Sequence, residues 1–175
     1  MADYLNQEER MLFYDLWYGL LEYAGHVKIT KDVKPEELKR LAEKVYLNPF
    51  LIDDYISVSD LDKREIKILE SWKHTVRGTF FLYKNLKEGA VVIENHSHEV
   101  YVCKGLSKPL NEAFLYMEPP VMFKGTLLPF EKTIVTDGLN AYMPYLLGSE
   151  IKEKLKYFYR IAGNENRIHR DLKNF

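Results

Sequence analysis

Cysteine is nearly missing from this chain of 175 residues, which contains only Cys103. A single cysteine cannot form an internal disulfide and cannot supply a zinc site built from several thiolates. No apolar run approaches the roughly 18 residues that mark a membrane span. The N-terminal segment MADYLNQEERM is acidic and polar, whereas a secretory signal peptide is basic and then apolar. These absences predict a cytoplasmic protein without a membrane-spanning segment.

Motifs that carry chemistry are also scarce. The sequence contains no glycine-rich phosphate loop, no zinc-protease helix motif and no serine nucleophile elbow. Hydrophobic residues make up 46% and charged residues 29% of the chain, which places it among globular proteins rather than disordered or fibrous ones. A chain of this length can bury a sizeable core, in one domain or in two small ones.

Charge is almost balanced over the whole chain but unevenly distributed along it. Residues 1–78 carry 12 Lys/Arg and 15 Asp/Glu, whereas the last 28 residues carry 7 and 4. The C-terminal segment, residues 148–175, is therefore the positive part, and its Lys152, Lys156 and Arg160 are the candidate contacts for an anionic partner. The alternative explanation is structural, because a helix dipole favours cations near a helix C-terminus.

Helix signals fill residues 1–77, which we expect to form a helical subdomain. Asn6 and Glu9 have the spacing of a capping box and precede a helix that ends near Gly25. Pro35 and the Asn48-Pro49 pair each indicate the start of a further helix. The apolar spacing of the next segment predicts a fourth helix over residues 60–77.

The second and third of these helices are close enough in sequence to suggest a DNA-binding helix-turn-helix. A recognition helix needs basic or amide side chains to contact phosphates and base edges. The third helix offers Asp53 and Asp54 instead and has no basic residue. Ordinary helix packing is therefore the favoured interpretation.

From Gly78 the apolar period changes from helical to alternating, which predicts strands near residues 78–83, 90–95 and 99–104. Residues 121–139 then form a hairpin with one turn at 129–132 and another at Asp137-Gly138, where glycine accepts positive φ. These features predict a small antiparallel five-stranded barrel-like sheet over residues 78–147. Ser149 is expected to cap a final helix that ends at Gly163. The fold class is therefore α+β.

The motifs of the second half resemble those of a known group. The run LLPFEKTIVTDGL, preceded by ESWKHTVRGTFFLYKNLKEGAVVI and by VYVCKGLSKPL, is similar to the C-terminal half of an uncharacterised family of bacterial proteins. The resemblance covers roughly Glu70 to Gly163. Where that family has a glycine-rich segment before the last helix, this chain has YMPYLLGSE. The resemblance implies a fold unit of a bacterial protein, and its motifs contain no catalytic signature.

The candidate metal site is the turn around His96 and His98, with Glu94 as a third ligand. Histidines two apart on a strand point to the same side and can bind one metal ion. Glu99 follows His98 directly, so the histidine and glutamate spacing of cupins is not met. A divalent metal here would predict a metal-assisted hydrolase, and the alternative is a solvated hairpin tip.

Two other candidates for catalysis have simpler structural explanations. Cys103 lies in an apolar strand, where a thiol is usually buried and unreactive. Asp137 could be a general base, but an aspartate before glycine usually hydrogen-bonds within its own turn.

Aromatic side chains on the expected sheet suggest a binding surface, although aromatics in strands are more often core residues. Those on or beside it are Phe80, Phe81, Tyr83, Tyr101 and Tyr116. Nucleic acid binding there would need phosphate contacts from the basic C-terminal helix, and its affinity would fall with rising salt. We favour a non-catalytic binding or protein-interaction module, with a protein partner or a homodimer as the simplest occupant.

Overall fold

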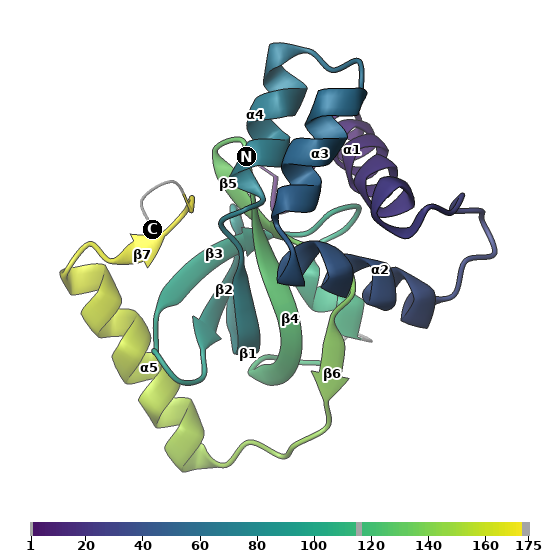
Figure 1. Cartoon of the computed structure of the whole chain (residues 1–175). Coiled ribbons are helices and arrows are strands. Elements are labelled where there is room, and N and C mark those ends of the chain that lie inside the picture. The colour runs from purple at the N-terminus through teal and green to yellow at the C-terminus, as the bar shows by residue number, and fades with distance from the viewer. Residues whose placement is uncertain (1, 115–116, 173–175) are drawn as a thin grey trace.

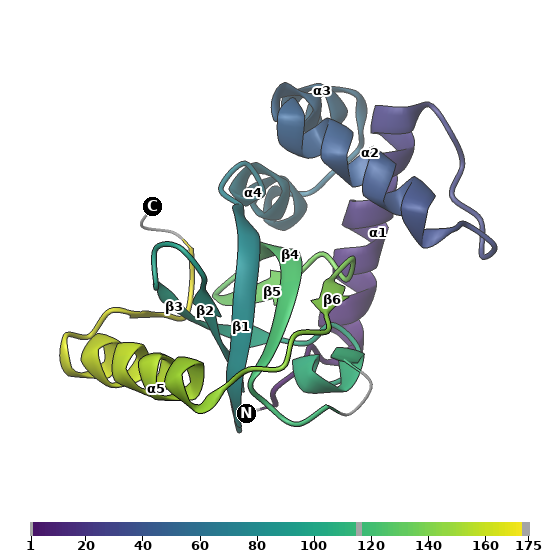
Figure 2. The same ribbon diagram turned by 90° about the horizontal axis from the view of Figure 1, so that it is seen from below.

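The computed structural model describes residues 2–114 and 117–172. It contains a cluster of four helices, a mixed sheet and a fifth helix on the far side of that sheet (Figures 1 and 2). In chain order the elements are α1 (Gln7–Gly25), α2 (Pro35–Leu47), α3 (Phe50–Val58), α4 (Lys63–Ser71), β1 (Val76–Leu86), β2 (Gly89–Glu94), β3 (Val100–Lys104), a 3₁₀ turn (Leu110–Phe114), β4 (Val121–Phe130), β5 (Thr133–Thr136), β6 (Ala141–Met143), α5 (Ser149–Asn164) and β7 (Ile168–His169). The α+β class is confirmed, and within the described residues no helix is both long and apolar enough to cross a membrane.

Helix α1 begins and ends as its sequence predicts. The Glu9 amide donates to Asn6 Oδ1 at 2.9 Å and the Asn6 amide donates to Glu9 Oε2 at 2.8 Å, which completes the capping box. The helix ends at Gly25, and His26 follows in the left-handed region at φ 50°. Its apolar residues are buried on two sides, which places α1 at the centre of the helical cluster.

The fourth helix is shorter than predicted. Asp62 and Glu65 form a second capping box, so α4 begins at Lys63, and the helix ends at Ser71. The segment to Arg77 was expected to be helical, but Val76 and Arg77 already belong to β1 and pair with Leu127 and Thr126 of β4. Pairing with β4 therefore overrides an apolar spacing that continues past the end of α4.

The sheet has seven strands, five of which close into a ring in the order β1-β2-β3-β5-β4, with β4 paired back to β1. Most neighbours are antiparallel, as expected. The pairs β3–β5 and β3–β7 are parallel, so the sheet is mixed and not purely antiparallel. The difference arises because the β4–β5 hairpin places β5 beside β3, and because β7, which lies beyond the five predicted strands, also pairs with β3.

The inside of the ring is apolar and holds a residue from the C-terminal tail. Phe80, Phe123, Cys103 and Ile134 belong to this interior cluster, and Leu172 joins it with only 2% of its surface exposed. On the outer face of the sheet, Leu155 and Ala162 of α5 pack against strand residues such as Phe81. Helix α5 is capped by Gly148, so Ser149 is its first residue and not its N-cap, and it ends one residue past the predicted Gly163.

The helical cluster and the ring share buried residues. Leu128, Phe130 and Val135 of β4 and β5 belong to the same apolar cluster as the helices. The Trp72 indole also donates to the Pro129 carbonyl oxygen at 2.9 Å. The division into subdomains 1–77, 78–147 and 148–175 stays a prediction, and these contacts join the first two.

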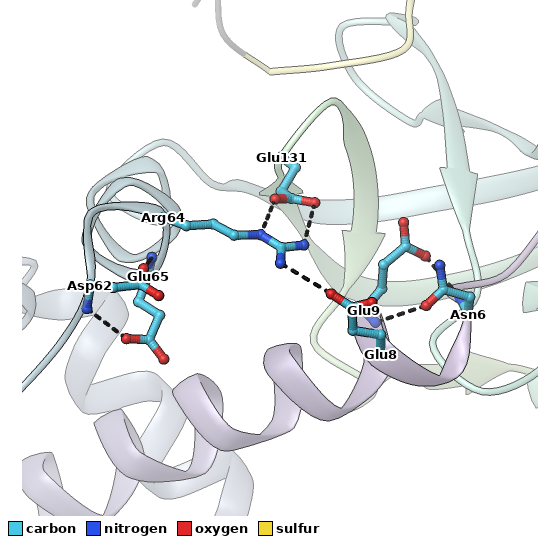
Figure 3. Close-up of polar contacts among 7 residues, drawn as sticks. All are labelled: Asn6, Glu8, Glu9, Asp62, Arg64, Glu65 and Glu131. Carbon is cyan, nitrogen blue, oxygen red and sulfur yellow. Dashed lines mark hydrogen bonds and ion pairs between the residues drawn. The ribbon is translucent and has the colours of Figure 1, made fainter.

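One arginine links three elements at the surface of this junction (Figure 3). Arg64 of α4 donates from Nε to Glu131 Oε1 at 2.6 Å and from Nη1 to Glu8 Oε1 of α1 at 3.3 Å. Glu131 lies in the two-residue β4–β5 turn, where it adopts φ 53°. The turn expected at residues 129–132 and the positive φ expected at Gly138, 77°, are both present.

Candidate functional site

The contacts of the predicted metal residues hold a turn together. Glu94 Oε2 accepts the main-chain N–H groups of His96 at 2.8 Å and of Ser97 at 2.6 Å. Burial opposes ionisation of this carboxyl, but these hydrogen bonds outweigh it and lower the pKa of Glu94. The His98 ring stacks on Phe158 of α5 at 3.9 Å between centroids.

These contacts favour a structural role for the turn. Among the residues that the structure describes, no group of three or more His, Cys, Asp or Glu side chains is arranged to hold a metal ion. The metal site at Glu94, His96 and His98 stays a prediction that direct analysis can test.

The predicted aromatic and basic ligand residues are distributed over different surfaces. Phe81 is buried beneath α5, and Tyr83 packs on Tyr159 of that helix at 5.6 Å between centroids. Tyr101 belongs to the interior of the ring, where burial is the main cause that raises its pKa to about 12. Lys152, Lys156 and Arg160 are exposed at four-residue spacing along α5. Tyr116 lies outside the described residues.

A different place brings together buried titratable groups and a cleft. Helix α2 crosses the outer face of β1 and β4, and between them lies a cleft of about 440 Å³. Its walls are α2 on one side, β1, β4 and β6 on the other, and the β5–β6 connection at one end. Clefts of this size between packed units are common ligand sites.

At the inner end of the cleft, a tyrosine and a carboxyl from opposite walls are hydrogen-bonded. The Tyr46 hydroxyl of α2 donates to Asp137 Oδ2 at 2.7 Å. The Leu139 amide donates to Asp137 Oδ1 at 2.9 Å within the turn that follows β5. Asp137 is 6% exposed, so both of its oxygens are engaged in a mostly dry environment.

Burial perturbs both groups of this pair. It raises the pKa of Asp137, against the effects of the Tyr46 hydroxyl and the Leu139 amide, which favour the carboxylate. Burial and the Asp137 charge hold the pKa of Tyr46 well above its usual value. A buried carboxyl of raised pKa in a cleft is a recognised feature of functional sites, and it also occurs in structural pairs.

The rim of the cleft is basic. Arg77 of β1 pairs with Glu43 of α2 across the opening, and its guanidinium carbon lies 4.7 Å from the centroid of the Tyr46 ring. Lys39 and Lys124 also line the cleft, one from each wall. The lining of the cleft therefore includes three basic side chains against two acidic ones, Glu43 and the buried Asp137.

Four of the residues that line the cleft have little or no side chain. Gly78 and Gly125 are cross-strand partners in the β1–β4 ladder. Ala42 and Ala141 flank them in the cleft wall. The space on the side-chain side of both glycines is filled, because an added Cβ would lie 2.5 Å from Asn140 Oδ1 at Gly125 and 3.1 Å from Glu94 Oε1 at Gly78.

Comparisons with known proteins found no family model, no curated protein and no solved structure that matches the chain. The resemblance to an uncharacterised bacterial family therefore stays a prediction. Functional inference rests on the geometry of the cleft.

Sequence patterns indicate only part of this site. The Asp137-Gly138 pair predicts a turn, and the hydrogen bond from Leu139 confirms the role of Asp137 in it. Tyr46 and Arg77 carry no local signature, because Tyr46 is separated from Asp137 by 91 positions in the chain. Alternation along β1 and β4 could have placed Arg77 and Lys124 on the same outer face.

Proposed function

We propose that the protein is a non-catalytic binding module of a bacterial cytoplasmic protein, and that the cleft between α2 and the sheet binds a small anionic ligand. The observation that carries the proposal is the set of three basic side chains, Lys39, Arg77 and Lys124, that line one cleft of about 440 Å³. A cation-rimmed cleft attracts anions, and a guanidinium can bind a carboxylate or phosphate through two parallel hydrogen bonds.

Binding is favoured over catalysis because both oxygens of the buried Asp137 carboxyl already accept hydrogen bonds from the protein. A general base must be able to reach a proton of the substrate. Asp137 instead accepts from Tyr46 and from its own turn, and so fixes α2 against the sheet. Placement in the cytoplasm is supported by the single cysteine, which is buried and unpaired with another. The bacterial assignment rests on the sequence resemblance alone.

Arg77 is the residue that we expect to respond to the ligand. In the structure its charge is balanced by Glu43 at the rim. An anion entering the cleft would compete with Glu43 for the guanidinium of Arg77. Because an exposed ion pair contributes at most about 1 kcal/mol, replacing Glu43 by the anion would cost little free energy.

Thermal unfolding with a panel of small anions tests the proposal. The panel contains inorganic phosphate, mono- and dicarboxylates and nucleoside monophosphates, each titrated at constant ionic strength. A ligand that binds the folded state stabilises it by about 2.7 kcal/mol at a concentration 100 times its Kd. We expect one class of anion to raise Tm, and Lys124→Glu to abolish the shift.

The matched control is Lys31→Glu, which makes the same charge change at an exposed position before α2. It should leave the Tm shift intact. If every anion fails to stabilise the wild-type chain, or if both variants lose the shift equally, the cleft is not an anion site.

A further inference from the structure

The C-terminal tail, residues 165–172, adds the short strand β7 to one edge of β3, outside the closed order of the five-stranded ring. Strand β2 occupies the other edge of β3 throughout. Strand β5 pairs with Cys103 and Lys104, and β7 pairs with Val100 and Tyr101. The edge of β3 opposite β2 is therefore paired partly by β5 and partly by β7 of the tail. Figure 1 shows β7 lying beside β3.

Residues 165–172 carry two arginines, one histidine and two acidic residues, and basic side chains among them lie against two glutamates of the sheet. Arg170 pairs with Glu88 at 3.0 Å, where the β1–β2 turn approaches the tail. His169 Nε2 lies 2.6 Å from Glu99 Oε2, and Arg167 lies 3.8 Å from the other oxygen of Glu99. Glu88 and Glu99 thus each hold one basic side chain of the tail closely, whereas Arg167 donates to Glu165 within the tail at 2.6 Å.

An apolar anchor follows these charges. Leu172 is 2% exposed and belongs to the cluster inside the ring, together with Cys103 and Tyr101. The tail therefore binds as extended peptides bind to sheet edges: main-chain pairing gives alignment, and one side chain enters a pocket.

The tail lies between two cavities and does not fill the space around it. One cavity of about 520 Å³ has Arg170 in its wall, with Glu88 and Val102. Another of about 480 Å³ has Leu172 in its wall, with Pro129 and His74. The two cavities share Glu131 and Lys132 of the β4–β5 turn.

We propose that the edge of β3 is a docking groove for an extended peptide with one basic residue and an aliphatic anchor, and that the chain's own tail is its resident, displaceable occupant. The groove recognises the pattern that the tail shows, a basic residue at the place of Arg170 and an aliphatic residue at the place of Leu172. A partner segment with this pattern replaces the tail and pairs with Val100 and Tyr101.

Displacement is feasible because little of the tail is held by main-chain pairing. Strand β7 is two residues long, and the segment before it, Glu165 to Arg167, is exposed. Its other contacts include partly exposed ion pairs, which contribute little individually, the His169 ring beside Tyr101 at 5.1 Å between centroids, and the burial of Leu172. A tethered segment competes with a free peptide as if it were present at millimolar concentration.

Cys103 provides a built-in reporter of this groove. It is the single cysteine, it is fully buried inside the ring, and burial raises the pKa of its thiol. It shares its cluster with Leu172, so release of the tail opens a route from solvent to the thiol. The rate of modification by a thiol reagent then follows the fraction of open molecules.

The experiment uses the full chain with Leu172→Asp, which removes the anchor, and a synthetic peptide of residues 166–172, NRIHRDL. We expect Cys103 in this variant to be modified at least about tenfold faster than in the wild type. The peptide should bind the variant more tightly than the wild type and slow the modification again. A peptide with aspartate in place of its leucine should do neither. Leu146→Asp, at a fully exposed leucine before α5, is the matched control and should behave as the wild type.

A second variant keeps the test decisive if Leu172→Asp does not fold. Arg170→Glu acts at an exposed side chain and places like charges beside Glu88, so it loosens the tail without altering the core. Its faster modification should be reversed by Glu88→Arg in the same chain. If both tail variants fold and Cys103 reacts at the wild-type rate, or if the peptide does not bind at millimolar concentration, the groove proposal is refuted.

A second copy of the chain is one possible donor of the peptide. Light scattering of the wild type at increasing concentration reports this directly. A dimer that the free peptide dissociates would identify the tail of a second copy as an occupant and would support the groove. A dimer that persists in excess peptide would place the self-association elsewhere and would exclude the tail of a second copy as an occupant of the groove.

Discussion

The hydrogen bond between Tyr46 and Asp137 should contribute measurably to stability, because it joins the helical cluster to the sheet inside a mostly dry cleft. Tyr46→Phe removes the donor and leaves a buried carboxyl oxygen without a partner. The expected cost is about 1–3 kcal/mol in the free energy of unfolding, from the desolvation of that oxygen. Asp137→Asn should cost a similar amount, because an amide cannot accept from both Tyr46 and Leu139 in the present geometry.

A double-mutant cycle isolates the pair. The double variant should lose less free energy of unfolding than the two single variants lose together, with a coupling energy of about 1–2 kcal/mol. Urea unfolding followed by tryptophan fluorescence is a suitable assay, because Trp17 and Trp72 are both buried in the core of the helical cluster. Trp17 also stacks on Tyr46 at 6.1 Å between centroids, so it senses the site.

The pH dependence gives a second, independent measure of the pair. The pKa of Asp137 is raised above 3.8 in the folded state, so protonation favours folding. The stabilisation of the folded state by protonated Asp137 is complete below pH 3.8 and is lost as the pH rises through the folded-state pKa of Asp137. The pKa of Tyr46 is raised above 10.0, so its contribution is complete below pH 10 and is lost as the pH rises further.

The difference in the free energy of unfolding between wild type and Asp137→Asn should therefore change as the pH rises from 3.8 through the folded-state pKa of Asp137. The difference in the free energy of unfolding between wild type and Tyr46→Phe should change above pH 10. Additive single-variant effects, with a coupling energy below about 0.5 kcal/mol, would refute the reasoning. The reasoning would also be refuted if the differences in the free energy of unfolding did not change with pH in either of these two pH ranges.

Two further predictions concern the packing at the ring and the metal question. Gly125→Ala should destabilise the fold by about 1–3 kcal/mol, since the new Cβ would lie 2.5 Å from Asn140 Oδ1; Gly163→Ala, in α5 with no contact closer than 3.9 Å, should be neutral or stabilising in the same urea assay. Elemental analysis after dialysis without chelator should find divalent metal well below one equivalent, because Glu94 and His98 are engaged in the turn. Near-stoichiometric metal that His98→Ala removes would instead support the metal-assisted hydrolase.

Features set by a few neighbouring residues were predictable from the sequence. The capping box of α1, the end of that helix at Gly25 and the turn at Asp137-Gly138 each depend on hydrogen bonds or φ angles within four residues. Alternating apolar residues likewise indicated the strands, because one face of each packs inward.

Features set by distant partners were not predictable in this way. The segment 72–77 keeps the apolar spacing of a helix, yet the chain turns at Trp72 and Lys73, and Val76 and Arg77 become strand because they pair with β4. Strand β7 is a two-residue segment of a polar tail, defined by its partner β3. The cleft has the same origin, because Tyr46, Arg77 and Asp137 become neighbours only when α2 lies across the finished sheet.

The buried residues that the helices share with the sheet also bear on biosynthesis. The four N-terminal helices leave the ribosome before β4 and β5 exist, yet their core includes Leu128, Phe130 and Val135. Until those strands emerge, the apolar faces of α1 and α4 lack part of their cover, and the Trp72 indole lacks the Pro129 carbonyl. The nascent helical cluster is thus an incomplete unit that must remain protected from aggregation for about 60 further residues of synthesis.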